Sequence, residues 1–154
     1  MMNLRFLVIF VLAVSFIACE EENGKEEPIV DFEEGVFIGK LSVDQNDDTF
    51  YEQENVEVVI SRVDENTINM DMLKVKFSNY MPVSLDMGIN GIDIVAKEGM
   101  FLLSGNNIIP TAMGGQFPQY TITAMEGELT SQDIAFSMIC GEFPLTFSGT
   151  VKSE

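Results

Sequence analysis

From Gly35 onward, apolar and polar residues alternate along most of the chain, which is the pattern of half-buried β-strands. In the first predicted strand, Phe37, Gly39, Leu41 and Val43 share one face. Further runs are expected at 56–61, 68–77, 88–94, 100–103, 120–129, 134–140 and 145–151. Polar or glycine-bearing turns separate them, residues 104–118 form the longest loop, and no helix is predicted after residue 18. The pattern predicts about eight antiparallel strands in a sandwich or barrel.

In two of these runs the alternation of apolar and polar residues shifts by one position, at residues 72–73 and 124–125. Such a shift marks a β-bulge, which bends and twists a strand. Bent strands are what a closing sheet needs. The first and last strands also share an apolar-Gly-apolar pattern, centred on Gly39 and Gly149. Because glycine permits close backbone approach, we expect these two strands to pair and to close the sheet as a barrel.

The chain begins with Arg5 and an apolar run from Phe6 to Ala18, which is the layout of a secretory signal. This run of about 13 residues is shorter than the ~20 that a membrane-spanning helix needs. The segment Phe16-Ile17-Ala18-Cys19 resembles the lipobox of bacterial lipoproteins. The resemblance implies cleavage before Cys19 and acylation of that cysteine. The alternative is an ordinary signal peptide cleaved nearby, with Cys19 incidental.

Three acidic residues, Glu20, Glu21 and Glu22, follow the cysteine and resemble the surface-export signal of Bacteroidetes-type lipoproteins. The alternative is a solvated acidic spacer. Residues 19–33 are acidic and poor in apolar groups, so we expect a flexible linker. The sequence is therefore divided into a lipoprotein signal peptide (1–18), a lipidated acidic linker (19–33) and a β-domain (34–154).

Charge and composition exclude several classes of function. The 154 residues include 25 acids, 8 bases and no histidine, and losing residues 1–18 moves the formal net charge from −17 to −18. Binding nucleic acid requires clustered Lys and Arg, so no nucleic-acid partner is expected. Histidine is the commonest general base and metal ligand, and no phosphate-loop or nucleophile motif is present. We expect a non-enzymatic protein with no cofactor and no metal.

The remaining candidate chemistry has simpler interpretations. Glu126 and Glu128 share one strand face, as in a carboxylate-dependent hydrolase, but their apolar neighbours occupy the opposite phase, so both are expected to face solvent. The segment 44–48 offers oxygen ligands without a full calcium-loop pattern, which favours a turn. Cys140 lies in an apolar strand and is expected to be a buried small hydrophobe rather than a reactive thiol.

Several of the strand patterns together resemble a family. Gly35–Leu41 resembles the opening strand of the calycin-like (lipocalin-like) β-barrel lipoproteins of Bacteroidetes-type bacteria, and 55–60 with 67–79 continues the likeness. Residues 87–94 are similar to that family's glycine-bearing hairpin, and Leu145–Val151 to its closing strand. The resemblance implies an eight-stranded antiparallel calycin-like barrel, lipid-anchored at the outer membrane and facing the periplasm or the cell surface. It carries over no catalytic residue.

The predicted interior combines flexible methionines with aromatic residues, which suits a cavity for a small hydrophobic ligand. The candidate lining residues are Phe37, Met70, Met72, Phe77, Met100, Tyr120, Phe136 and Met138. The alternative is a filled core, because an eight-stranded barrel is just wide enough for its own side chains. We expect a protein that binds such a ligand or an envelope or extracellular partner. The alternative is a structural or interaction lipoprotein that uses exposed apolar loops near 108–110 or 117–118.

Overall fold

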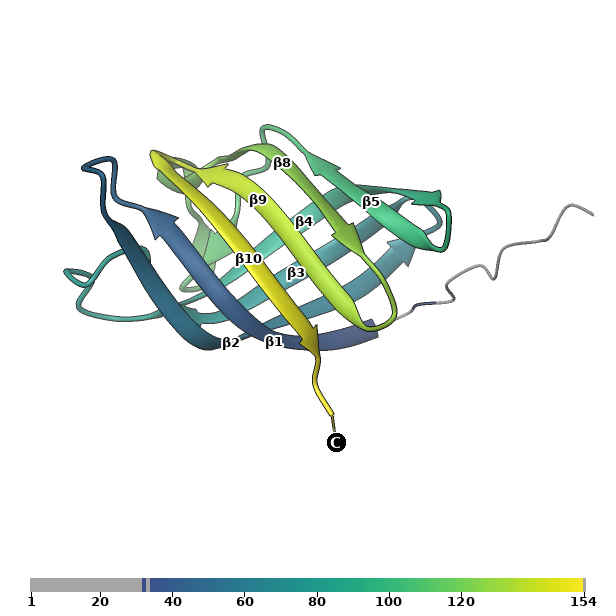
Figure 1. The fold of residues 1–154 in the computed structure, drawn as a ribbon. Coiled ribbons are helices and arrows are strands. Elements are labelled where there is room, and N and C mark those ends of the chain that lie inside the picture. The colour runs from purple at the N-terminus through teal and green to yellow at the C-terminus, as the bar shows by residue number, and fades with distance from the viewer. Residues whose placement is uncertain (1–31, 33, 154) are drawn as a thin grey trace, which may run out of the picture.

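Eight antiparallel strands close into a barrel, as predicted (Figure 1), and a small hairpin is added to it. The computed structural model describes residue 32 and residues 34–153. The barrel strands are β1 (Glu34–Asp44), β2 (Phe50–Asp64), β3 (Thr67–Val75), β4 (Leu85–Lys97), β5 (Met100–Gly105), β8 (Ile122–Leu129), β9 (Asp133–Cys140) and β10 (Phe143–Val151). Between β5 and β8 lie β6 (Thr111–Ala112), β7 (Gly115–Gln116) and the 3-10 helix η1 (Pro118–Tyr120).

The barrel closes where its first and last strands pair, with Gly39 of β1 opposite Gly149 of β10. A Cβ atom on Gly39 would lie 2.0 Å from the Ser148 carbonyl oxygen and 2.5 Å from the Gly149 Cα. On Gly149, a Cβ would meet the ring of Phe147 at 2.8 Å. The two glycines therefore allow the strands to approach and leave room inside for an aromatic ring. The predicted pairing of the terminal strands is confirmed.

Both predicted bulges are present. The register of β3 against β4 shifts between Met72 and Val75, where Lys74 has a φ of +54°. That of β8 against β9 shifts between 123 and 126, where Ala124 has a φ of +49°. A third bulge, which the sequence did not indicate, lies in β2 at Asn55 (φ +56°). These irregularities add the bending that a closed sheet requires.

The expectation of a glycine-bearing hairpin at 87–94 is wrong, because these residues lie inside the single strand β4. Gly91 has a φ of +80° and occupies a bulge, while Ile92 and Asn90 pair with consecutive residues of β3. The Gly91 N–H donates to the Asn69 side-chain oxygen at 3.1 Å. Both flanks of the bulge stay paired with β3, so the Asn-Gly dipeptide bends the strand without reversing it.

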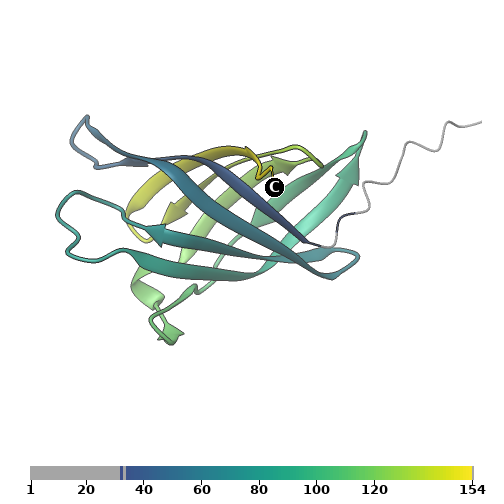
Figure 2. The ribbon, with the colours of Figure 1, turned by 90° about the horizontal axis from the view of Figure 1, so that it is seen from below.

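The connections between strands lie at the two ends of the barrel, and the longest of them share one end (Figure 2). At one end, here called the entry end, the chain enters β1, leaves β10 and makes three short turns (65–66, 98–99 and 130–132). At the other, the loop end, lie the connections 45–49, 76–84, 106–121 and 141–142. Antiparallel order forces this division, since successive connections alternate between the ends.

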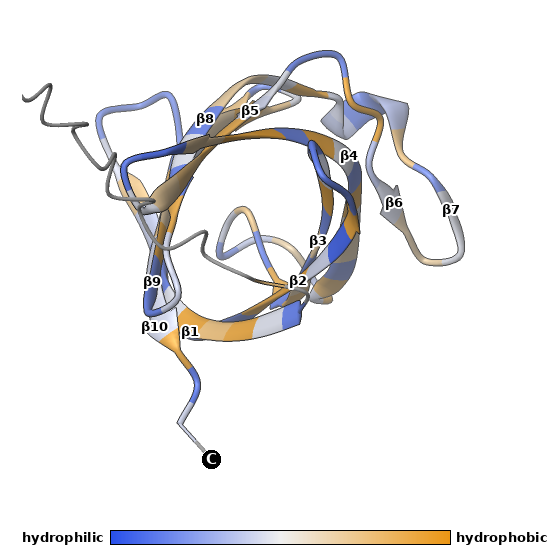
Figure 3. Cartoon of the chain, turned by 90° about the vertical axis from the view of Figure 1, so that its right-hand side faces the viewer, coloured by the Kyte–Doolittle hydropathy of each residue, from blue (hydrophilic) through white to orange (hydrophobic). Residues whose placement is uncertain are grey.

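The segment expected to be one long loop, 104–118, is more ordered than predicted. It contains the end of β5 and the hairpin β6–β7, which leads into η1. The hairpin attaches to the outside of β4 through pairing of Thr111 with Gly88 and of Ala112 with Met87. Figure 3 shows it standing beside the barrel wall. A polar, glycine-rich composition concealed a hairpin with only two residues in each strand.

Replacing Gly39 by alanine should prevent normal closure, because the new Cβ would overlap backbone atoms of β10 that cannot rotate away. We expect a loss of at least about 3 kcal/mol in the free energy of unfolding, measured by urea denaturation. Gly115→Ala is the matched control, since its Cβ would meet nothing within 4 Å, and it should change stability by less than about 0.5 kcal/mol. Equal stability of the two variants would contradict this account of closure.

Candidate functional site

Side chains from all eight barrel strands fill the interior. Ile60, Met70 and Met72 have 0% exposed surface, which leaves no water-sized space against them. Phe136 and Phe147 stack beneath β9 and β10 with their ring centroids 5.3 Å apart. Six of the eight residues predicted to line a cavity are buried in this core: Phe37, Met70, Met72, Phe77, Phe136 and Met138. The structure brings these six together as packing partners.

The other two predicted lining residues lie elsewhere. In β5 the buried positions are Phe101 and Leu103, so Met100 belongs to the opposite phase and is only partly buried. Residues 100–103 are all apolar, so the sequence did not indicate which of them point into the barrel. Tyr120 belongs to η1 at the loop end and not to a strand. The prediction that Met100 faces the interior is therefore wrong, whereas Tyr120 packs against the core from the loop end instead of from a strand.

Aromatic side chains cover the core at the loop end. The Phe77 ring lies 5.1 Å from that of Tyr120 and 6.0 Å from that of Phe143, measured between centroids. The Gln45 side chain donates to the Phe77 carbonyl oxygen at 2.8 Å, and the Phe77 N–H contacts the Met81 sulfur at 3.0 Å. Three connections of the loop end, 45–49, 76–84 and 106–121, thus meet at Phe77. This aromatic plug lies where an open barrel would have its mouth.

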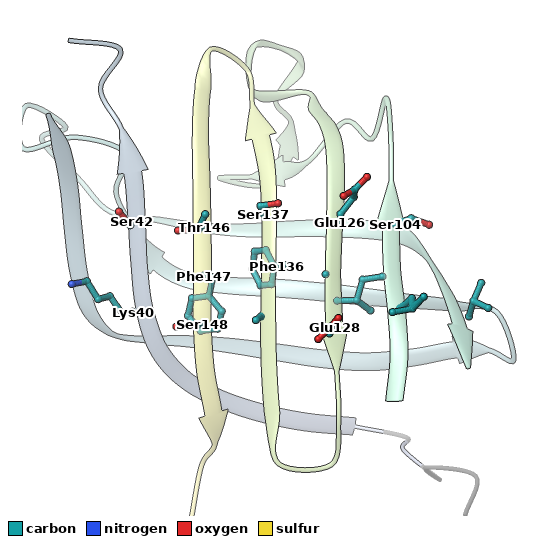
Figure 4. Close-up of a pocket in the computed structure, with 15 residues that line it drawn as sticks. Lys40, Ser42, Ser104, Glu126, Glu128, Phe136, Ser137, Thr146, Phe147 and Ser148 are labelled. Carbon is teal, nitrogen blue, oxygen red and sulfur yellow. The ribbon is translucent and has the colours of Figure 1, made fainter. Parts of the chain in front are cut away.

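A groove of ≈ 990 Å³ lies on the outer face of the barrel (Figure 4). It crosses β1, β10, β9, β8 and β5 and reaches Val95 of β4. A smaller depression of ≈ 290 Å³ adjoins it and shares Ser42, Ser137 and Thr146 with it. The smaller depression extends to the exposed ring of Phe50 and to Ile139. We call the larger depression the outer groove.

Strand register aligns the side chains of the outer groove in two rows. Each member of the first row pairs with the next across five strands, and Figure 4 shows them in line: Ser42, Thr146, Ser137, Glu126 and Ser104. The second row runs parallel to it: Lys40, Ser148, Ala135, Glu128 and Leu102. These rows cannot be recognised in the sequence. Small polar residues on outward strand positions were the visible signal, but their alignment depends on pairings between distant strands.

Charge in the outer groove is uneven. Lys40 lies at the β1 side, with its Nζ 2.9 Å from Glu52 Oε2 and 3.5 Å from Glu54 Oε1. Its hydrogen bond to Glu52 is the main cause that raises the pKa of Lys40. Glu126 and Glu128 are exposed, as predicted, and neither forms an ion pair with any residue that the structure describes. The β8 side of the groove is therefore acidic, whereas the cation on the β1 side is already engaged.

The loop end carries exposed apolar residues within an uncharged part of the sequence. No charged residue occurs from 99 to 125, although 21% of the chain is charged. Within this segment Ile109 is 41% and Met113 76% exposed, and Met113 has a φ of +51°, which is uncommon for a bulky residue. In the connection 76–84, Tyr80 and Val83 are also exposed. Of the loop positions predicted for an apolar patch, Ile109 and Pro118 are exposed, whereas Pro110 is buried.

Cys140 is buried, as expected, and its Sγ lies 3.5 Å from the Tyr120 carbonyl oxygen and 3.9 Å from the Met87 sulfur. Burial raises the pKa of the Cys140 thiol from 9.0 to about 12. The segment 44–48 forms the expected polar turn. In that turn the Asp44 carboxylate accepts the Asn46 N–H at 2.8 Å and the Asp47 carboxylate accepts the Thr49 N–H at 3.1 Å.

Other predicted features lie outside the described residues: the signal peptide at 1–18, Cys19, Glu20, Glu21 and Glu22. Within the part of the chain that is described, no group of three or more His, Cys, Asp and Glu side chains could hold a metal ion. No helix in that same part is long and apolar enough to cross a membrane. Comparison with protein-family models, with curated proteins and with solved structures gave no match.

Thiol reagents should not reach Cys140 in the folded protein. In a Cys19→Ala chain, where Cys140 is the only thiol, alkylation at pH about 8 should proceed only after unfolding in urea. The raised pKa also predicts a pH effect on stability: the thiol's contribution is full below the unfolded value near 9 and falls as the pH rises towards 12. Alkylation of the native protein as fast as that of the unfolded chain would refute the burial.

Proposed function

We propose that this protein is a lipid-anchored, non-enzymatic barrel of the outer membrane that binds a protein partner through its loop end. The observation that carries the proposal is the combination of a filled interior with exposed apolar residues at the loop end. An interior whose residues are almost completely buried offers little volume to a ligand, which favours recognition at the outer surface. Tyr80, Val83, Ile109 and Met113 are exposed in two connections of this end, and we infer that together they provide the apolar surface of an interaction site.

The position of the loop end supports this assignment. The chain enters the barrel at the opposite end, where Glu34 begins β1. A barrel tethered through Cys19 would carry its loop end on the side away from the point of attachment. The uncharged segment 99–125 avoids the cost of desolvating charge when a partner covers it. The positive φ of Met113 fits the same role, because backbone strain in an exposed residue favours a functional explanation over a packing one.

The anchor itself is supported by the sequence Phe16-Ile17-Ala18-Cys19. One acyl chain binds a membrane only marginally, and each buried CH₂ contributes about 0.8 kcal/mol, so two or three chains would hold the protein firmly. The likeness to calycin-like lipoproteins agrees with the closed eight-stranded barrel. A non-enzymatic role is supported by the lack of histidine in the sequence and by the exposure of Glu126 and Glu128.

Cells supplied with radiolabelled fatty acid should incorporate the label into the intact protein and not into Cys19→Ala. The expected loss follows because the thioether to the lipid requires that sulfur. Fluorography of the purified protein measures it. Label that persists in Cys19→Ala would disprove the lipid anchor while leaving the loop-end proposal to its own test.

A photoreactive amino acid placed at the exposed position Gln116 should give a discrete covalent adduct in cells that produce the partner. Met113→Asp should reduce the yield about tenfold, because burying a methionine side chain contributes about 1.5–3 kcal/mol. Aspartate tolerates positive φ, so the hairpin should keep its shape. Val63→Asp is the matched control, since Val63 is 56% exposed on β2 near the entry end. Adduct yield is read by immunoblotting.

Two outcomes would contradict this proposal. Equal loss of adduct in Met113→Asp and Val63→Asp would show that the loop end is not the contact. Saturable uptake of a fluorescent fatty acid, abolished by Met72→Glu, would instead place a ligand inside the barrel.

A further inference from the structure

We propose that the outer groove is a docking site for an extended polypeptide segment of a partner, with an arginine or lysine of that segment placed between Glu126 and Glu128. The proposal does not rest on the loop-end contact, because the lining of the groove shares no residue with the exposed apolar residues of the loop end. It adds a second surface and a chemical class of occupant.

Charge selects the occupant. Glu126 and Glu128 have no cationic neighbour within ion-pair distance in the described structure, and Lys40 is held by Glu52 and Glu54. The charge left free in the groove is therefore negative, in a chain whose net charge is also negative. Nucleic acids and other polyanions are repelled from such a surface, while a cationic segment is attracted and oriented.

The placement of the two carboxylates fits a single cation. They belong to the two neighbouring rows of the groove and are two residues apart along β8. Side chains at i and i+2 of a strand emerge from the same face about 7 Å apart. A guanidinium or ammonium group between them lies within reach of both, and arginine's fixed donor geometry suits paired carboxylate acceptors.

The rest of the groove accommodates an uncharged chain. Ser42, Thr146 and Ser137 present hydroxyl groups that both donate and accept, as peptide groups require. Val95 and Leu102 provide apolar contact at the far side. Four strand spacings separate β1 from β5 along a row, or about 19 Å, which is room for about six extended residues.

The closed barrel determines how the partner's peptide segment can be bound. Every strand beneath the groove is paired on both sides, so the partner cannot be recognised by adding a strand to a sheet edge. Recognition must use side chains projecting from a fixed surface. The stacked rings of Phe136 and Phe147 support that surface from inside, so little order has to be gained on binding.

A display library of random short peptides, selected against the purified full chain, tests the proposal. Enriched sequences should share an arginine or lysine flanked by uncharged residues, and their affinity should fall as salt rises. Glu126→Gln with Glu128→Gln should weaken binding about 3- to 30-fold, as two exposed ion pairs allow, and should remove most of the salt dependence. Ala135→Tyr, which fills the middle of the groove, should abolish binding.

Three controls distinguish a specific effect at the outer groove from a change in net charge, a change elsewhere on the surface or a loss of folding. Glu65→Gln with Glu98→Gln removes the same charge from two turns of the entry end and should leave the peptide affinity unchanged. Met113→Asp should also leave it unchanged, which distinguishes failure here from failure of the loop-end proposal. Circular dichroism verifies that each variant folds.

Three results would overturn the assignment: no enriched peptide, enriched peptides without a basic residue, or equal affinity for the wild type and the Glu126→Gln/Glu128→Gln variant. Dimerisation of the wild type that this variant loses would show that a second copy fills the groove, and would overturn it as well.

Discussion

The rest of the structure depends on the pairing of β1 with β10. A sheet of eight strands that failed to close would expose two long edges of unpaired N–H and C=O groups and would be prone to aggregate. Closure requires the terminal strands to approach across Gly39 and Gly149, where any Cβ would collide with the opposite backbone or with the Phe147 ring. It also requires bending, which the bulges at Asn55, Lys74 and Ala124 supply. Two missing side chains and a few residues at positive φ thus determine whether the remaining alternation of apolar and polar residues forms a barrel.

Closure in turn limits the space inside the barrel. An eight-stranded barrel is only just wide enough for the side chains that point into it. Here those positions carry large residues, including Phe37, Phe136 and Phe147, and the methionines adapt their shape to the remaining gaps. The aromatic plug around Phe77 then covers the end at which a ligand would enter. Flexible methionines can serve a cavity or fill a core. In this protein their near-complete burial shows that they fill the core, and we propose that the outer wall and the connections recognise partners.

The sequence predicted the strands well because period-two alternation is a local property. It also predicted the two bulges at 72–73 and 124–125. Apolar residues alternate regularly on both sides of each bulge, so the shift by one residue can be seen in the sequence. The bulge at Asn55 was invisible, because polar residues occupy both phases just before Val56. At Asn90-Gly91 a typical hairpin dipeptide misled, since pairing of both flanks with β3 overrides the local turn preference. The outer groove could not be predicted from the sequence for a different reason. The alignment of Ser42 with Thr146, Ser137 and Glu126 depends on the register of three successive strand pairs, and one undetected bulge shifts it.

The two proposed contacts are linked through the strands that carry them. The insertion with the exposed hairpin, residues 106–121, connects β5 to β8, and these two strands pair directly and form the acidic side of the outer groove. A partner that contacted both the hairpin and the outer groove would form its second contact within the complex already held by the first. The second contact then forms at a high effective concentration, so two weak surfaces give firm binding without a large interface. Screening by salt would weaken only the groove contact, while the uncharged hairpin would keep its apolar contribution. The barrel wall between them is rigid, so the spacing of the two contacts on this chain is fixed, and it selects partners that place a basic segment at the matching distance from an apolar patch.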